Sequence, residues 1–300
     1  MGIQLTRDAR GRGRASANPR QRLLHGWDWQ DARIELDELA PGSRVLVPAG
    51  AGERVAALAA AGHAVVAISA NREQLDYARR RAAGGAFEAG TAERLLDLGR
   101  GLVRAASRDW SRRRMLQFLR EDDPIRAAQH WKERLDNRTL ASVLRAALAP
   151  AGSGSARMLR DFSTALPNHF DEAVRGRIAR ALRKHAPRDN PFAWRLLLGE
   201  ELRGHTVPVA PEHAVTWVAE PLLEHLESAR PGSYDAISLS NASDGAEERW
   251  MRDLRKAAVR AVAAGGPVIA RSLATTMDDE AAKRARRDRA MLWGSIVVQR

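Results

Sequence analysis

The sequence predicts an α/β fold: a doubly wound, mostly parallel sheet with a large helical insertion between its second and third strands. Three observations predict it. An apolar segment at residues 44–52 ends in a glycine-rich turn, and another at residues 234–241 ends in Ser240-Asn241. Buried parallel strands have this composition, and such sheets bind ligands beyond the carboxyl ends of their strands. Between residues 83 and 204, by contrast, apolar residues recur only at helical spacing.

The first half of the sheet is predicted by one strand–helix–strand unit. A turn signal at Pro41-Gly42 precedes the first strand, and the apolar residues after Gly52 have helical spacing. Gly62-His63 ends that helix, and residues 64–68 form the second strand. We therefore expect a right-handed crossover, followed by a helix over residues 72–81.

The rest of the chain is predicted to be helical at first and α/β again afterwards. Helical periodicity is present within 23–39 and at 95–102, 115–119, 125–148 and 158–182. The later α/β elements are strands at 215–218, 234–241, 267–270 and 291–298 and helices at 221–226 and 247–263. We divide the chain into a flexible basic arm (1–22), the first part of a cofactor-binding α/β domain (23–82), a helical insertion acting as substrate or lid subdomain (83–208), and the second part of the α/β domain (209–300).

The composition excludes several functional classes. The chain has 300 residues and no cysteine, which excludes disulfides, thiolate nucleophiles and cysteine-bound metals. Its histidines lack metal-ligand spacing, so we expect no metal. The net charge of +12 comes mostly from clustered arginines, which we interpret as solvated basic faces and not as a nucleic-acid-binding surface. Without a signal segment or an apolar span, we expect a cytoplasmic protein with at most peripheral membrane contact.

The first candidate site is the turn Gly50-Ala51-Gly52. Glycine there lets a ligand approach the backbone, and the N-terminus of the following helix favours negative charge. Val55 stands where a dinucleotide fingerprint has its third glycine, which argues against NAD but not against other adenosine cofactors. The glycines can equally serve only to make the bend.

Further candidates lie at the ends of the second and third strands. Ser69, Asn71 and Gln74 follow the second strand, where such folds usually place a carboxylate on a ribose hydroxyl. They can also cap the next helix. Glu220 follows the third strand and is the corresponding candidate for the adenine or ribose end, or a carboxylate that begins a helix.

In their order, these motifs resemble the betaine-lipid synthase family of S-adenosylmethionine-dependent 3-amino-3-carboxypropyl transferases, a branch of the class I methyltransferase fold. The resemblance covers most of residues 25–300. It is carried by Trp29-Gln30-Asp31, the Gly50/Gly52 turn, Asn71-Arg72-Glu73-Gln74-Leu75, Trp131, Asn190-Pro191-Phe192, Gly199, Tyr234-Asp235, Ser238-Leu239-Ser240-Asn241, Gly265-Gly266, Arg271 and Asp288-Arg289. Ser69 stands where the family usually has Asp, Gln30 replaces Glu, and the first loop is altered. The chain is also shorter than the lipid enzymes, which is consistent with an isonocardicin-synthase-like enzyme for a small molecule.

The resemblance implies a reaction and the residues that carry it. Attack on the γ-carbon of S-adenosylmethionine would move its 3-amino-3-carboxypropyl group to a small-molecule or lipid acceptor and release methylthioadenosine. Ser240 and Asn241 would hold the amino acid arm or the acceptor, and Arg271 would pair with the carboxylate of that arm. Asp31 would hold its ammonium group or act as a base. The implied cofactor-binding residues are Gly50, Ala51, Gly52, Ser69, Asn71, Gln74, Glu220 and Arg271.

Several alternatives remain open at the level of the sequence. Closure of the same arm on its own amine would give azetidine-2-carboxylate at an identical site without an acceptor. Ordinary methyl transfer and a non-catalytic binding module use the same fold. If the acceptor is a hydroxyl, Asp244, Glu247 or Glu248 could be its general base. Neither the acceptor nor the oligomeric state can be predicted from the sequence.

Overall fold

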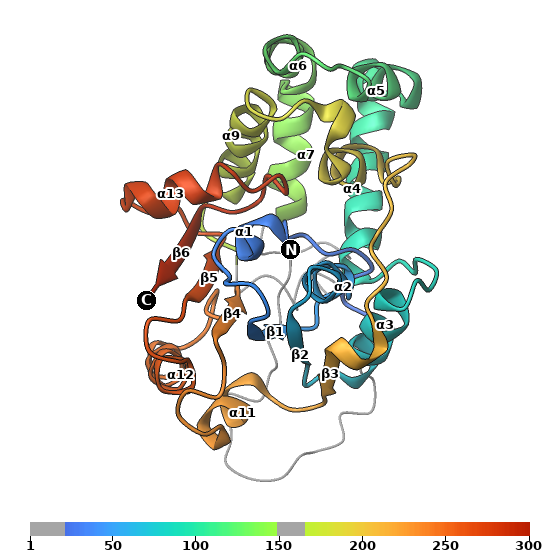
Figure 1. Ribbon diagram of the computed structural model, residues 1–300. Helices are drawn as coiled ribbons and strands as arrows, with labels where there is room; N and C mark the ends of the chain where they lie inside the picture. Colours follow the sequence, from blue (N-terminus) through green and yellow to red (C-terminus); the bar gives the residue numbers. More distant parts are fainter. Residues whose placement is uncertain (1–21, 149–165) are drawn as a thin grey trace.

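The central element is a six-stranded sheet with the order β3-β2-β1-β4-β5-β6 (Figure 1). The computed structural model describes residues 22–148 and 166–300, so the predicted basic arm and the start of the predicted helix 158–182 lie outside the described residues. All strands are parallel except β6, which runs antiparallel to β5. The strands are β1 (Arg44–Pro48), β2 (Ala64–Ile68), β3 (Val215–Val218), β4 (Ala236–Ser240), β5 (Val268–Ser272) and β6 (Ser295–Gln299).

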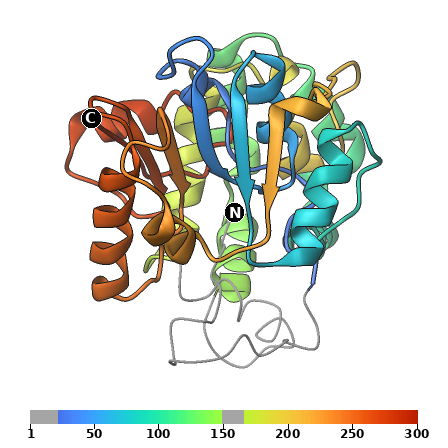
Figure 2. The same ribbon diagram turned by 60° about the horizontal axis from the view of Figure 1, so that its bottom comes forward.

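Helices cover both faces of this sheet, because apolar side chains of β1 point alternately to one face and to the other. Val45 and Val47 pack with α2 (Glu53–Ala60) and α3 (Arg72–Ala82), whereas Leu46 belongs to a second cluster with α11 (Leu222–Ser228) and α12 (Glu248–Ala261). Successive side chains of a strand point to opposite faces, so β1 is buried on both sides. Figure 2 shows α12 beyond one edge of the strands and α3 beyond the other. The predicted α/β fold with a mostly parallel sheet is confirmed.

Between β2 and β3 the described residues form helices and no strand. In Figure 1 most of these helices lie above the sheet. They are α4 (Thr91–Ala106), η2 (Arg108–Trp110), α5 (Arg112–Leu119), α6 (Pro124–His130), the π-helical turn η3 (Trp131–Leu135), α7 (Arg138–Leu148), α9 (Phe170–Leu182), η4 (Pro187–Asp189), α10 (Pro191–Ala193), the π-helical turn η5 (Trp194–Leu198) and η6 (Glu212–Ala214).

Several predicted boundaries differ from the structure. The helical region predicted over 125–148 is interrupted because Asn137 starts a new helix, accepting a hydrogen bond from the Leu140 amide (3.0 Å). In the region predicted over 158–182, α9 begins only at Phe170. The pattern within 23–39 yields only the short helix α1 (Arg33–Leu36). The last strand begins at Ser295 and not at 291, because Met291 has a positive φ and residues 291–293 enter the core instead.

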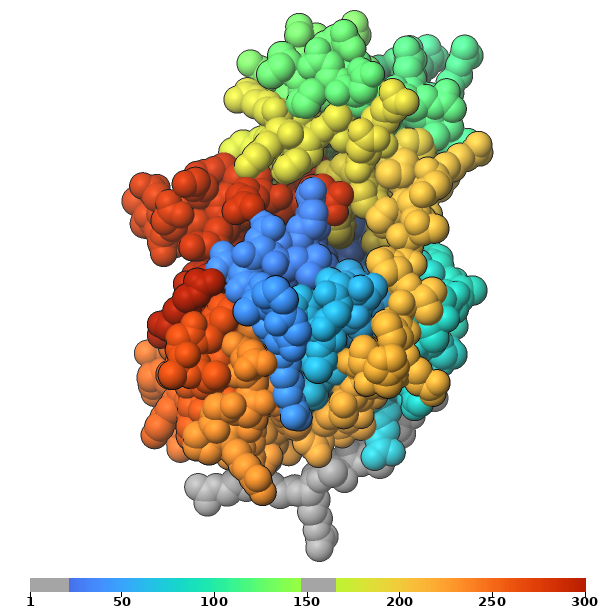
Figure 3. Space-filling view, in the orientation of Figure 1, coloured from blue at the N-terminus to red at the C-terminus, as the bar shows by residue number. Residues whose placement is uncertain are grey.

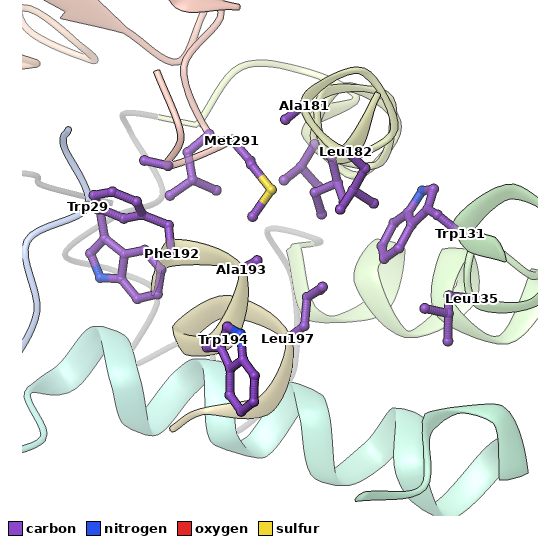
Figure 4. Packing of buried hydrophobic residues seen from close by; sticks show 14 of the residues in the cluster. Trp29, Trp131, Leu135, Ala181, Leu182, Phe192, Ala193, Trp194, Leu197 and Met291 are labelled. Carbon is purple, nitrogen blue, oxygen red and sulfur yellow. The ribbon is translucent and has the colours of Figure 1, made fainter. Parts of the chain in front are cut away.

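The largest hydrophobic cluster joins parts of the chain that are distant in sequence. It contains Trp29, helical residues such as Trp131 and Leu182, Ile269 of β5, and Met291 near the C-terminus. Figure 4 shows Trp29, Phe192, Met291 and Leu182 converging from four different segments. The helices between β2 and β3 therefore share one core with the end of the sheet that carries the candidate residues.

Candidate functional site

The sheet reverses its direction of winding between β1 and β4, and this is the topological switch point where open α/β sheets bind ligands. The turn Gly50-Ala51-Gly52 follows β1 and Ser240-Asn241 ends β4, so both predicted motifs lie at this point. Gly50 and Gly52 have φ angles of 54° and 91°. A Cβ on Gly52 would lie 2.2 Å from the Ala78 carbonyl oxygen, so this position requires glycine.

The glycine turn is occupied by a carboxylate of the chain itself. Asp28 Oδ1 accepts a hydrogen bond from the Ala51 amide (3.0 Å), and Oδ2 accepts one from the Arg54 amide (2.8 Å). Asp28 is buried, and no ion pair with a cationic side chain is found for it within residues 22–148 and 166–300. The only positive charge that faces the Asp28 carboxylate there is the partial charge at the N-terminus of α2. Asp28 was not predicted to be a site residue, although its position between the two tryptophans Trp27 and Trp29 indicated a buried carboxylate.

The candidates after β2 hold the N-terminal segment in place. Ser69 Oγ accepts a hydrogen bond from the Asn71 amide, and Asn71 caps α3 by accepting one from the Gln74 amide (3.2 Å). Gln74 Oε1 accepts from the amides of Leu24 and His25, and Gln74 Nε2 donates to the carbonyls of His25 and Gly50. Gln74 thus fixes residues 24 and 25 against the glycine turn.

Ser240 and Asn241 end β4 in a strained, buried conformation. Ser240 has a φ of 55°, a left-handed value rare outside glycine. The sheet register shifts between Ser238 and Ser240, and Ser240 Oγ accepts a hydrogen bond from Gln30 Nε2. Asn241 is 1% exposed, and its Nδ2 makes no well-formed hydrogen bond among the described residues, although it approaches the Asp244 carboxylate closely enough to lower the pKa of that group. A buried amide with spare hydrogen-bonding capacity is a candidate binding group.

Asp31 lies close to this strand end but is held by two arginines. It accepts hydrogen bonds from Arg33 (2.9 Å) and from Arg289 (2.8 Å). Burial would raise the pKa of Asp31, but the guanidinium groups of Arg289 and Arg33 outweigh it and lower the pKa to about 2. A carboxyl group with this pKa is a weak base, so the geometry favours a charge-holding role over a proton-accepting one.

Arg271 is buried and bound to carboxylates of the chain. Its guanidinium donates to both oxygens of Glu35 (2.5 and 2.8 Å) and more weakly to Asp288 (3.4 Å). Burial would lower the pKa of Arg271, but Glu35 and Asp288 raise it. Burial would likewise raise the pKa of Glu35, whereas Arg271 and Arg54 lower it to about 2. Pairing with a cofactor carboxylate would require Arg271 to leave Glu35.

Arg54 extends this network to the strands at the switch point. Its Nη1 donates to Glu35 (2.9 Å), Gln30 (2.5 Å) and Ser238 of β4 (3.1 Å), and its Nη2 donates to the Pro48 carbonyl at the end of β1 (3.0 Å). Neither Arg54 nor Glu35 was predicted to belong to the site. Both lie in amphipathic helical segments, where a charged residue is usually exposed.

Glu220 is separated from these residues. It follows β3, and β2 and β1 lie between β3 and β4. The Glu220 carboxylate is exposed and contacts His225 Nδ1 (2.9 Å), whose Nε2 contacts the Tyr234 hydroxyl (2.7 Å). The structure therefore brings together the turn 50–52, Asp31, Ser240, Asn241 and Arg271, and places Ser69, Asn71 and Gln74 beside the turn, but not Glu220.

The segment of residues 22–31 covers the switch point. Trp27 and Trp29 are buried, and Trp27 stacks on Phe87 with ring centroids 4.4 Å apart. Arg195 of η5 reaches the start of α2 from the other side, donating to Glu53 (2.6 Å) and Glu201 (2.7 Å). In the space-filling view a hollow lies where the blue N-terminal segment meets the yellow and gold segments (Figure 3).

No protein-family model matches the chain, and no curated protein or solved structure is detectably similar to it. Within the described residues, no helix is long and apolar enough to cross a membrane. Function therefore has to be argued from the site.

Proposed function

We propose that the chain binds S-adenosylmethionine at the β1/β4 switch point and transfers its 3-amino-3-carboxypropyl group to a small-molecule or lipid acceptor. The observation that carries the proposal is Asp28, a buried carboxylate at the glycine turn without a cationic partner among the described residues. A sulfonium cofactor with an ammonium group carries the positive charge that such a carboxylate lacks.

The topology supports the same cofactor class. A parallel sheet with the strand order found here binds nucleotide ligands at its switch point. Its last strand is antiparallel, which departs from the all-parallel dinucleotide sheet and is typical of the class I methyltransferase fold. The helical segment between β2 and β3 would then be an insertion that walls the acceptor site.

The polar groups at the switch point fit such a cofactor, although residues 22–31 must shift to admit it. Asp28 and Asp31 would face its positive groups, and the buried Asn241 amide beside Asp244 would donate to its carboxylate or to the acceptor. When bound, the cofactor supplies an electrophilic γ-carbon and a neutral leaving group. The chain's own contribution is to position the acceptor and to exclude water.

The structure favours Asp244 as the general base. The Asp244 amide donates to the Asn241 carbonyl (3.0 Å), so the carboxylate lies one turn beyond the candidate amide. Burial raises the pKa of Asp244, although hydrogen bonds from Ser272, the Leu273 amide and the Asn241 side chain oppose that shift. A raised pKa makes Asp244 a better proton acceptor for a hydroxyl than Asp31.

One observation favours closure of the arm on its own amine as a second candidate. Ser240 and Asn241 are 6% and 1% exposed, so residues 22–31 must shift even to admit the cofactor, and a reaction of the cofactor alone requires the smaller opening. The cyclisation to azetidine-2-carboxylate needs no acceptor site.

The deciding experiment identifies the nucleoside released when the purified protein is incubated with S-adenosylmethionine, alone and with candidate acceptors. Methylthioadenosine formed only with acceptor is the expected result, and its release without acceptor indicates cyclisation. Asp28→Asn should weaken cofactor binding about tenfold, and Asn241→Ala should lower turnover roughly 100-fold. Asp253→Asn, an exposed change on α12, is the matched control. Release of S-adenosylhomocysteine, or no binding at all, contradicts the proposal.

A further inference from the structure

A groove lined by arginines lies away from the switch point, between α5, η4 and the loop at residues 200–205. It consists of two adjoining cavities of about 560 Å³ and about 670 Å³, which share Arg112, Leu116 and Arg120. The charged side chains that line it are Arg112, Arg113, Arg120, Arg188, Asp189, Glu200, Glu201 and Arg203. Each cavity has the size of an ordinary small-molecule site.

The arginines of α5 stand where the helix itself disfavours them. The first turn of α5 is Arg112-Arg113-Arg114, without an acidic residue and without a side-chain cap from Ser111. The N-terminus of a helix carries partial positive charge, so three cations there repel it and each other. Arg114 is compensated by Asp109, but the groove-lining Arg113 has no such partner among the described residues. A bound anion would remove this repulsion.

The ion pairs of the groove leave several guanidinium groups uncompensated. Arg112 is bound through two nitrogens to Glu200 (3.0 and 2.9 Å), whereas Arg188 reaches Asp122 only at 3.5 Å. For Arg113, Arg120 and Arg203 no ion pair is found within residues 22–148 and 166–300. These three are exposed and come from two segments far apart in sequence.

The remaining lining indicates the kind of anion. Trp194, Leu116 and Leu202 add apolar side chains to the lining of the smaller cavity. Glu200, Glu201 and Asp189 interrupt the basic lining, which opposes a continuous phosphate backbone such as that of RNA. The planar guanidinium group of arginine can donate two parallel hydrogen bonds to the oxygens of a phosphate. Several such groups around one cavity therefore favour a ligand with more than one negative charge.

We propose that this groove binds a compact ligand that bears a phosphate group and a small apolar body. The phosphate lies among Arg120, Arg188 and Arg203, which line the same cavity as Trp194, and the apolar body lies against Trp194. This site stands on the groove alone and does not depend on the function proposed for the switch point. A soluble phosphate ester and a phospholipid headgroup have the same chemistry here.

The test measures binding of pyrophosphate to the full-length protein by calorimetry, and of phosphatidylcholine vesicles with and without phosphatidic acid by sedimentation. The variant Arg120→Gln/Arg203→Gln removes the two guanidinium groups of this cavity for which no ion pair is found among the described residues. Arg249→Gln/Arg255→Gln is the control, since it removes the same charge from exposed positions of α12 that do not line the groove.

We expect saturable binding of one pyrophosphate that is weakened at least about tenfold in the groove variant and unchanged in the control. If the natural ligand is a headgroup, vesicle binding falls in the groove variant alone and pyrophosphate competes with it. Equal weakening in both variants, or no saturable binding to either probe, overturns the proposal. So does affinity for single-stranded RNA that rises with its length and is lost in the groove variant.

Discussion

Arg271 of β5 is buried and bound by carboxylates of the chain itself. The sequence places it at the end of β5, where a ligand-binding arginine is expected, and the resemblance assigns it to a cofactor carboxylate. In the structure its guanidinium already binds Glu35, and Asp288 lies beyond it. Nothing local in the sequence indicates this pairing, because Glu35 and Arg271 are 236 positions apart.

Replacing Arg271 by methionine should destabilise the protein strongly. The change leaves the buried Asp288 without its arginine partner and leaves Glu35 paired only with Arg54. Removing one member of a buried ion pair lowers the free energy of unfolding by about 3–5 kcal/mol, because the other member stays buried and uncompensated. Urea unfolding followed by circular dichroism measures this cost. Arg252→Met removes an exposed arginine that pairs with Glu248 on α12 and should change the free energy of unfolding little. An equal effect of the two changes would contradict the structural role of Arg271.

At the scale of elements, the segment of residues 22–31 is held by side chains of α3 and α4, with Gln74 at its start and Glu93 at Gly26 and Trp27. Gln74 makes four hydrogen bonds to backbone groups of this segment and of the glycine turn. The Gln74 amide accepts two of these hydrogen bonds through its oxygen and donates two through its nitrogen, so its own hydrogen-bonding capacity is filled. The segment needs such support because it forms neither strand nor helix and has only bends, at residues 26, 27 and 30.

Gln74→Ala should loosen this segment without unfolding the sheet. We expect faster hydrogen exchange at the amides of Leu24 and His25 and a free energy of unfolding lowered by about 1–3 kcal/mol, because buried donors lose their acceptor. Hydrogen exchange read by mass spectrometry locates the change. Gln129→Ala, which removes an exposed amide that bonds to Glu133 on the same helical segment, is the control. Unchanged exchange at residues 24 and 25 would show that Gln74 does not hold the segment.

The elements that the sequence predicted well are those determined by local patterns. The strand predicted at 64–68 coincides with β2, since its five apolar residues lie between two turn signals. The strand predicted at 215–218 is β3. Asp28 could not be predicted in the same way. Its partners are backbone amides of residues 51 and 54, and which carboxylate reaches a helix N-terminus depends on how the chain folds back.

At the scale of the whole molecule, the two ends of the described chain are tied together by buried charges. Arg289 binds Asp31, Arg271 binds Glu35, and the Trp293 indole donates to the Trp29 carbonyl (3.0 Å). Asp288 stands among these groups with only a 3.4 Å contact to Arg271 and the Ala290 amide as a donor. The network therefore contains one carboxylate that is much less compensated than Asp31 and Glu35.

This difference predicts opposite pH dependences within one network. Asp31 and Glu35 have pKa values lowered to about 2, so the stability they contribute is present above their ordinary values of 3.8 and 4.5 and is lost as the pH falls toward 2. Burial raises the pKa of Asp288 to about 7, against the opposing effect of Arg271. The folded protein therefore holds this proton more tightly than the unfolded chain, and Asp288 costs stability as the pH rises from about 4 to 7.

Asp288→Asn isolates that contribution, because asparagine can still accept the Ala290 hydrogen bond but cannot ionise. The buried His63 and the half-buried His185, whose pKa values burial lowers, change the stability of both proteins equally and cancel in the difference. We expect the variant to gain stability relative to the unchanged protein between pH 4 and 7, with a slope of at most about 1.4 kcal/mol per pH unit. Urea unfolding at successive pH values measures the difference. If it does not change with pH, Asp288 is ionised in the folded protein, and the network is compensated more evenly than its distances indicate.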